Sequence, residues 1–170
     1  MVPDIDETPH AGEAPEATAT RLAQEKAMEI ANRIPNALII GSDQVATING
    51  EQIGKPGSHQ NALMQLQKMR GNKVIFHTAL CLLDNRKSPA DVQLENVQTF
   101  VTFRNLPDTE LDCYLKIEQP YDCAGSAKNE GLGIALIEKI ESTDPTALTG
   151  LPLIALTAML RHAGVSFFQK

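Results

Sequence analysis

The sequence of 170 residues has no tryptophan, few other aromatic residues and three cysteines. Cys81, Cys113 and Cys123 form no C-x-x-C pair, which argues against a zinc site and against a disulfide framework. A reducing cytoplasm fits this cysteine content. The longest apolar run falls well short of the roughly 20 residues that a membrane span needs. The acidic N-terminal residues differ from the basic and then apolar pattern of a signal peptide. We therefore expect no export and no membrane anchor.

Positive charge is also scarce. The chain has 15 Lys and Arg residues and 21 Asp and Glu residues, which gives a net charge of −6. Binding to nucleic acid depends on neutralising phosphates with Lys and Arg, so it is not expected here. The four histidines are scattered, and each is interpreted as a surface or packed residue rather than as a metal ligand. The chain is long enough to form one domain, residues 1–170, with its own core.

The hydrophobic pattern predicts a mixed α/β protein with one substantial sheet. A helix is expected to begin at Pro15 and to end before Pro35. A second helix is expected to be capped by Ser58 and stopped by Gly71. The remaining predicted elements are strands at 37–42, 74–83, 97–103 and 134–140, a short helix near 107–117, and a helix between Pro152 and Gly164.

The stretch LIIGSDQVATINGEQIGKP, residues 38–56, carries the first candidate site. A buried strand runs into Asp43, and in α/β sheets ligand crevices lie beyond strand ends. An Asn49-Gly50 hairpin then leads to Lys55, which Gly54 and the following proline hold in a stiff turn. A solvated surface position is the alternative interpretation of Lys55. Asp43 has an alternative role, because Ser and Asp side chains also stabilise turns by bonding to nearby backbone amides.

A glycine-rich stretch, CAGSAKNEGLG at 123–133, precedes a predicted strand. A phosphate loop or dinucleotide-binding fingerprint must instead open a helix, so both are rejected. Two interpretations stay open. Gly131 and Gly133 adopt positive φ in a tight turn, or they let the backbone approach a flat ligand whose edge Glu130 contacts.

The N-terminal stretch DIDETP places Asp4, Asp6 and Glu7 within four residues. Such acids can hold a divalent ion through oxygen ligands, or they can simply be solvated. Lys26 on the first predicted helix has a solvated interpretation as well. Residue patterns alone do not choose between these alternatives.

Taken in order, six motifs resemble those of the Maf family of nucleotide pyrophosphatases. The motifs are PDIDETP at 3–9, RLAQEKA at 21–27, IIGSDQV at 39–45, GKP at 54–56, CAGSAKNEGLG at 123–133 and GLPL at 150–153. The resemblance implies an elongated, mixed-sheet α/β fold of the Maf and ITPase type, often dimeric, with a cleft across the sheet. It also implies hydrolysis of nucleoside triphosphates to the monophosphate and diphosphate with Mg²⁺ or Mn²⁺.

Carried over by position, the resemblance makes Asp43 the proton acceptor. It places Glu7, Lys26 and Lys55 in a polar cleft that handles phosphates and metal, with Glu7 as the metal residue. Gln44 and Glu130 resemble the branch that acts on 7-methyl-GTP, since the dTTP and UTP branch usually has threonine and glutamine there. An ionised Glu130 accepts hydrogen bonds only, which suits the N1 and amino donors of guanine and a cationic methylated base.

The sequence differs from the family pattern at its N-terminus. Family members begin with a strand and an S-x-S-x-R-R turn before DETP, and this sequence starts after them. We therefore expect an N-terminally truncated fold with impaired catalysis. Two alternatives are a catalytically inactive nucleotide-binding protein that regulates cell division, and a house-cleaning pyrophosphatase of broader specificity. The expected partners are a nucleotide and a second copy of the chain.

Overall fold

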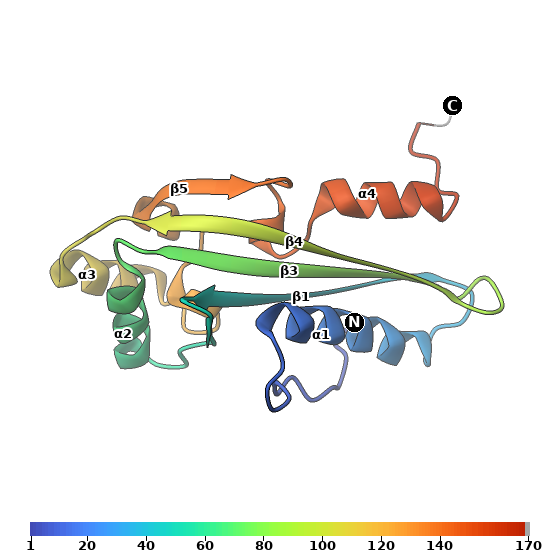
Figure 1. The fold of residues 1–170 in the computed structure, drawn as a ribbon, viewed down its shortest axis with the longest axis horizontal. Coiled ribbons are helices and arrows are strands. Elements are labelled where there is room, and N and C mark those ends of the chain that lie inside the picture. The colour runs from blue at the N-terminus through green and yellow to red at the C-terminus, as the bar shows by residue number, and fades with distance from the viewer. Residues whose placement is uncertain (169–170) are drawn as a thin grey trace. The chain divides into compact units, whose positions relative to one another are not determined.

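The computed structural model describes residues 1–168 and has a mixed α/β architecture (Figure 1). One five-stranded sheet has the order β2-β1-β3-β4-β5. The strands are β1 (Leu38–Ile48), β2 (Glu51–Ile53), β3 (Lys73–Asp84), β4 (Asp91–Phe103) and β5 (Ile137–Ser142). The helices are α1 (Pro15–Ala31), α2 (His59–Met69), α3 (Asp108–Glu118) and α4 (Leu153–His162). The predicted fold class is confirmed.

The chain divides into two compact units. The first comprises residues 1–43, 78–97 and the chain from Asp144 onward, and the second comprises residues 44–77 and 98–143. Strands β1, β3 and β4 contribute residues to both units. The single domain over residues 1–170 stays a prediction from the sequence.

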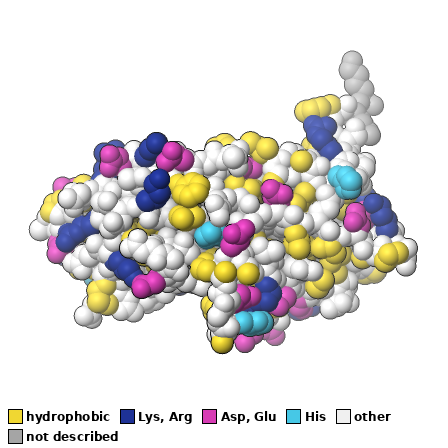
Figure 2. Space-filling model, in the orientation of Figure 1, with side chains coloured by type: hydrophobic (Ala, Val, Ile, Leu, Met, Phe, Trp, Pro, Cys, Tyr) yellow, Lys and Arg dark blue, Asp and Glu magenta, His cyan; other side chains and the backbone are white. Residues whose placement is uncertain are grey.

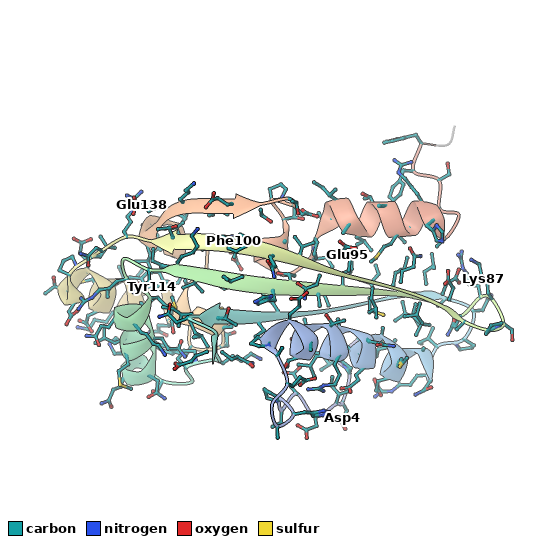
Figure 3. The ribbon with its side chains drawn as sticks, in the orientation of Figure 1. Asp4, Lys87, Glu95, Phe100, Tyr114 and Glu138 are labelled. Carbon is teal, nitrogen blue, oxygen red and sulfur yellow. The ribbon has the colours of Figure 1, made fainter. Side chains whose placement is uncertain are left out.

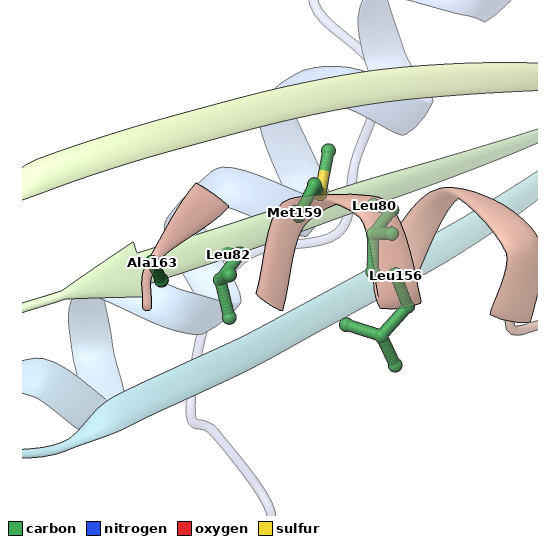
Figure 4. Close-up of a cluster of buried hydrophobic side chains, with 5 residues drawn as sticks. All are labelled: Leu80, Leu82, Leu156, Met159 and Ala163. Carbon is green, nitrogen blue, oxygen red and sulfur yellow. The ribbon is translucent and has the colours of Figure 1, made fainter. Parts of the chain in front are cut away.

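In the first unit the β3 residues from Thr78 to Asp84 are all buried. A strand that is buried at every position must be covered on both faces. On one face α4 packs its apolar side against the strand (Figure 4). The cluster there consists of Leu80, Leu82, Leu156, Met159 and Ala163.

The start of α4 is stabilised by a side chain outside the helix. Asp144 is 2% exposed, and its Oδ2 accepts hydrogen bonds from the backbone N–H groups of Ile154 at 2.7 Å and Ala155 at 3.3 Å. The first N–H groups of a helix have no partner within the helix, so a buried carboxylate that accepts from them acts as an N-cap. Asp144 therefore links the chain after β5 to the first turn of α4.

The predicted boundaries that depend on local signals are confirmed. The Ser58 side chain accepts a hydrogen bond from the Asn61 N–H at the start of α2, and Gly71 has a φ of +70° after its end. Asn49 and Gly50 both have positive φ, as the tight turn between the antiparallel strands β1 and β2 requires. The start and end of α2 and the turn between β1 and β2 are therefore determined by residues close to them in the sequence.

Three predicted strand boundaries were wrong. Strand β1 does not end at residue 42, because its β-forming residues continue to Ile48 and pair with β2. Strand β4 begins at Asp91 rather than at 97. Strand β5 begins at Ile137, since residues Leu132–Leu136 form a 3₁₀ helix. The first helix also ends at Ala31, before the predicted limit.

Within residues 1–168, no helix combines the length and the apolar character that crossing a membrane requires. The face shown in Figure 2 intersperses basic side chains with acidic ones, and no continuous basic surface forms on that face.

Candidate functional site

The first unit brings together three of the predicted site residues. Lys26 of α1 lies between two carboxylates, with its Nζ 2.6 Å from Oδ1 of Asp43 on β1 and 2.8 Å from Oε1 of Glu7. The side chains of Lys26 and Asp43 are 18% and 12% exposed, whereas that of Glu7 is 52% exposed. Lys26 therefore forms ion pairs with a largely buried carboxylate, that of Asp43, and with an exposed one, that of Glu7.

Helix α1 can approach β1 this closely because residue 41 is glycine. A Cβ atom on Gly41 would lie 2.2 Å from the carbonyl oxygen of Ala23 and 2.9 Å from the backbone nitrogen of Ala27. Ala23 and Ala27 are fully buried. The small residues of RLAQEKA and the glycine of GSD thus let two backbones meet, which places Lys26 beside Asp43.

The segment that carries Glu7 is anchored to α1 through Arg21. The Arg21 guanidinium donates to Glu13 at 2.8 Å and 2.9 Å and to the carbonyl oxygen of Thr8 at 3.1 Å. Hydrogen bonds from Arg21, and then from the backbone of His10, lower the pKa of Glu13 to about 2. Glu13 therefore stays ionised at neutral pH and holds the segment onto the helix.

The three acids of DIDETP do not form one cluster. Asp4 is exposed on the N-terminal segment (Figure 3), and Asp6 accepts a hydrogen bond from the Thr8 N–H at 2.9 Å. Only Glu7 reaches Lys26. The solvated interpretation of Lys26 was wrong, since its side chain is largely covered and bonded to two carboxylates.

Lys26 keeps its proton at neutral pH. Burial lowers the pKa of Lys26, but its hydrogen bonds to Asp43 and Glu7 raise that pKa by more, so the net shift is upward. The ammonium group is therefore available as a fixed positive charge. Charge-assisted hydrogen bonds of this kind are short and directional.

The carboxylates of Glu7 and Asp43 also suit one type of metal site. Mg²⁺ is commonly held by one or two carboxylates together with substrate phosphates and water, rather than by an all-protein cage. No cage of three or more His, Cys, Asp or Glu side chains occurs within residues 1–168. The donor set thus fits an ion that arrives with a phosphorylated ligand.

Ser42, the neighbour of Asp43, bonds to distant parts of the first unit. Its Oγ lies 2.8 Å from the carbonyl oxygen of Ala79 on β3 and 2.8 Å from that of Gly150 in GLPL. The hydroxyl has one hydrogen, so the two carbonyls share it. The alternative in which Ser42 and Asp43 stabilise a local turn was wrong, because both lie inside β1.

The second unit contains the remaining predicted residues, Gln44, Lys55 and Glu130. Gln44 is half-buried in β1 and Glu130 is exposed. Lys55 borders a hollow of about 290 Å³ beside α2, whose lining consists of Lys55, Pro56, Asn61, Met64, Gln65 and Lys68. Within residues 1–168 no hydrogen bond or ion pair joins Lys55 directly to Glu130.

The glycines of the 123–133 loop serve close packing. Gly131 has a φ of −113°, and positive φ within this loop occurs instead at Gly125 and Ser126. A Cβ on Gly131 would lie 2.7 Å from the Glu118 carboxylate, and a Cβ on Gly133 would lie 2.6 Å from the Lys128 backbone. The predicted positive φ at Gly131 and Gly133 was therefore wrong. The Lys128 backbone leaves no space for a side chain at Gly133, whereas at Gly131 the conflict is with the end of the Glu118 side chain.

Sequence reasoning missed the side chains that hold this loop. Two of them, Tyr114 and Glu118, lie on α3, and helical periodicity marks Tyr114 only as a core position. Glu118 accepts from the Leu132 N–H at 2.9 Å, and the Tyr114 hydroxyl (Tyr114 is labelled in Figure 3) accepts from the Lys128 N–H at 3.1 Å. No sequence signal identifies a hydrogen bond between residues so far apart in the chain.

A family model described as Maf-like protein matches residues 1–163. The chain belongs to the Maf family. It is similar to the 7-methyl-GTP pyrophosphatase of Cupriavidus pinatubonensis, with 64% identity over 98% of this chain and 83% of the relative. The protein of the same name from Cupriavidus metallidurans is 65% identical over 98% of this chain and 82% of the relative. That of Ralstonia nicotianae is 60% identical over 99% of this chain and 86% of the relative. The resemblance to the Maf family is confirmed.

Proposed function

We propose that this Maf protein is a nucleoside triphosphate pyrophosphatase, a hydrolase that cleaves 7-methyl-GTP to 7-methyl-GMP and diphosphate. The geometric observation that carries the reaction is the Glu7–Lys26–Asp43 cluster, in which a sheltered carboxylate lies against a fixed cation. The substrate follows from the name of relatives that share 60–65% identity with nearly the whole chain.

In the proposed reaction a water molecule attacks the α-phosphorus. The new P–O bond forms as the bond from the α-phosphorus to the bridging oxygen of the β-phosphate breaks, and diphosphate leaves. Asp43 accepts the proton of the attacking water. Positioned proton transfer of this kind contributes about 10²–10⁴-fold to the rate. Lys26 holds the Asp43 carboxylate in place through the 2.6 Å contact.

A divalent cation, Mg²⁺ or Mn²⁺, is part of this proposal, with Glu7 as its first protein ligand. When bound, the ion would offset the negative charge that develops on the phosphate oxygens. The exposure of the Glu7 carboxylate supports this role, because an ion bound to phosphates needs an accessible oxygen ligand.

The family resemblance assigns the proposed nucleotide contacts to Lys55, Glu130 and Gln44. Lys55 contributes positive charge to the phosphate chain from its position beside the hollow. Glu130 is exposed in its loop and, as a carboxylate, accepts hydrogen bonds from the N1 and exocyclic amino groups of guanine. Gln44 contributes to base selection. A cationic methylated base adds electrostatic attraction to Glu130.

Replacing Asp43 with Asn tests the proposed base. The variant keeps the shape of the side chain but removes its charge and basicity, so we expect diphosphate release from 7-methyl-GTP to fall by at least about 10²-fold. Asp4→Asn is the matched control, because Asp4 is exposed, and its activity should equal that of the parent. An Asp43→Asn variant as active as its parent would remove Asp43 from the mechanism. Nucleotide binding without any diphosphate release by the parent would favour an inactive binding protein.

Two further sequence predictions belong to this proposal. A homodimer is expected from the family resemblance, and sedimentation equilibrium of the purified chain measures it. A cytoplasmic location is expected from the cysteine content, and fractionation of cells that express the chain measures it.

A further inference from the structure

One side chain on α2 connects two separate loops of the second unit. Gln65 is half-buried, and its Nε2 donates to the carbonyl oxygen of Gly54 at 3.0 Å. Its Oε1 accepts from the hydroxyl of Ser126 at 2.6 Å. The Gly54 carbonyl can only accept a hydrogen bond, so the carboxamide has one orientation that satisfies both contacts.

The Ser126 end of this bridge is buried and conformationally demanding. Ser126 is 0% exposed and has a φ of +54°, next to Gly125 with a φ of +74°. Residues other than glycine rarely adopt positive φ, and they do so when surrounding contacts hold them. The hydrogen bond to Gln65 is one of these contacts, and the other is the bond from the Ser126 N–H to the Cys123 carbonyl at 3.1 Å.

Beyond Ser126 the loop is held at two more points, both on α3. The Lys128 N–H donates to Tyr114, and the Leu132 N–H donates to Glu118. The Lys128 carbonyl in turn accepts from the N–H groups of residues 131 and 133, each at 3.0 Å. Glu130 therefore lies at the tip of a short segment whose two ends are fixed.

The Gly54 end of the bridge leads directly to Lys55. The turn after Gly54 is held a second time, because Asn61 Nδ2 donates to the carbonyl oxygen of Pro56 at 3.0 Å. Gln65 and Asn61 lie one helical turn apart on α2 and so present their amides on one side of the helix. The backbone on both sides of Lys55 is thus fixed to α2.

We propose that Gln65 is a positioning residue that couples the turn bearing Lys55 to the loop bearing Glu130. This inference rests on the proposed function, in which Lys55 contacts the phosphates and Glu130 contacts the base. Through its two hydrogen bonds, Gln65 fixes the backbone positions of the turn that carries Lys55 and of the loop that carries Glu130. Selection of the methylated base therefore depends on the two hydrogen bonds by which Gln65 holds these loops.

Gln65→Leu removes both hydrogen bonds at similar volume and tests the proposal. We expect the KM for 7-methyl-GTP to rise about tenfold, because two contacts that position binding groups are lost, while kcat changes less. The ratio of kcat/KM for 7-methyl-GTP to kcat/KM for GTP should also fall in this variant. Ser126→Ala removes only one of the two bonds and should give a smaller change. Adding Ser126→Ala to Gln65→Leu should cause little further loss, because both changes remove the same bond.

Gln67→Leu is the matched control. It is the same substitution on the same helix, and the Gln67 side chain bonds to Asp108 at 3.0 Å rather than to either loop. Its KM and selectivity should equal those of the parent. Thermal unfolding of all variants separates a general loss of stability from the expected change in KM.

Amide hydrogen exchange provides a readout that does not require activity. In Gln65→Leu the N–H groups of Lys128 and Leu132 should exchange faster than in the parent and in Gln67→Leu, because the loop has lost the hydrogen bond from Ser126 to α2. Absence of turnover by the parent would overturn the proposed function and leave this exchange test intact. Equal KM, equal selectivity and equal exchange in Gln65→Leu and Gln67→Leu would overturn the proposal for Gln65.

Discussion

Gly41→Ala is the substitution that most directly perturbs the approach of α1 to β1. The added Cβ would lie 2.2 Å from the Ala23 carbonyl oxygen and 3.0 Å from the Ala27 Cβ. A carbon next to a carbonyl oxygen needs about 3.3 Å, so the helix must move away by roughly 1 Å. The atoms in conflict belong to the helix backbone and to an alanine, and no side-chain rotation relieves them.

The size of the effect follows from this displacement. Overpacking of a buried contact costs about 1–3 kcal/mol, so we expect the free energy of unfolding to fall by that amount. A shift of that size also separates Lys26 from Asp43, which are 2.6 Å apart in the parent. Misplacement of a catalytic group by about 1 Å can cost roughly 10²-fold in rate, and we expect a loss of that order in kcat.

Urea unfolding followed by circular dichroism measures the first effect, and diphosphate release from saturating 7-methyl-GTP measures the second. Gly54→Ala is the stability control, because a Cβ there meets no atom within 4 Å and its φ is not positive. It should unfold at a urea concentration equal to or slightly above that of the parent, because alanine restricts the unfolded chain more than glycine does. A Gly41→Ala variant with unchanged stability and unchanged kcat would refute the argument that this glycine sets the spacing of Lys26 and Asp43.

Asp144→Ala should lower the free energy of unfolding by about 2 kcal/mol, since it removes the buried cap of α4, and a change below about 0.5 kcal/mol in urea unfolding would contradict this. The pKa of Glu13 is lowered from 4.5 to about 2, first by Arg21, so its stabilising effect is present above pH 4.5 and is lost as the pH falls toward 2. Thermal unfolding at pH 5 to 2 should therefore depend less on pH in Glu13→Gln, and an identical dependence would count against the Arg21 contact. Glu130→Gln should lower the preference for 7-methyl-GTP over GTP, because it removes the charge that favours the methylated base. An unchanged preference would argue against contact of Glu130 with that base.

The parts of the fold that were predicted correctly depend on interactions between near neighbours. The Ser58 cap, the Gly71 stop and the Asn49-Gly50 turn each involve residues within a few positions of one another. Strand ends were harder, because they depend on pairing partners. Strand β1 continues past Asp43 and pairs with β2 from Ala46 to Ile48. The Asn49-Gly50 turn predicted this pairing, but it did not show that residues 38–48 form one continuous strand.

In the candidate site, too, interactions between residues distant in the sequence could not be predicted. Periodicity places Lys26 on an exposed part of a helix, and only the Gly41 contact brings that helix against β1. The motif resemblance named Lys26 as a candidate, but it gave no geometry. Gln65 had no signal at all, because its partners Gly54 and Ser126 lie 11 and 61 residues away along the chain.

The central claim is that this Maf protein hydrolyses 7-methyl-GTP in preference to other nucleotides. Its most direct test is kcat/KM for diphosphate release with Mg²⁺ from 7-methyl-GTP, GTP, dTTP and UTP. We predict that 7-methyl-GTP gives the highest value, at least about tenfold above each of the others, since a charged contact at Glu130 separates it from them. Equal values for all four, or a higher value for dTTP or UTP, would contradict the account.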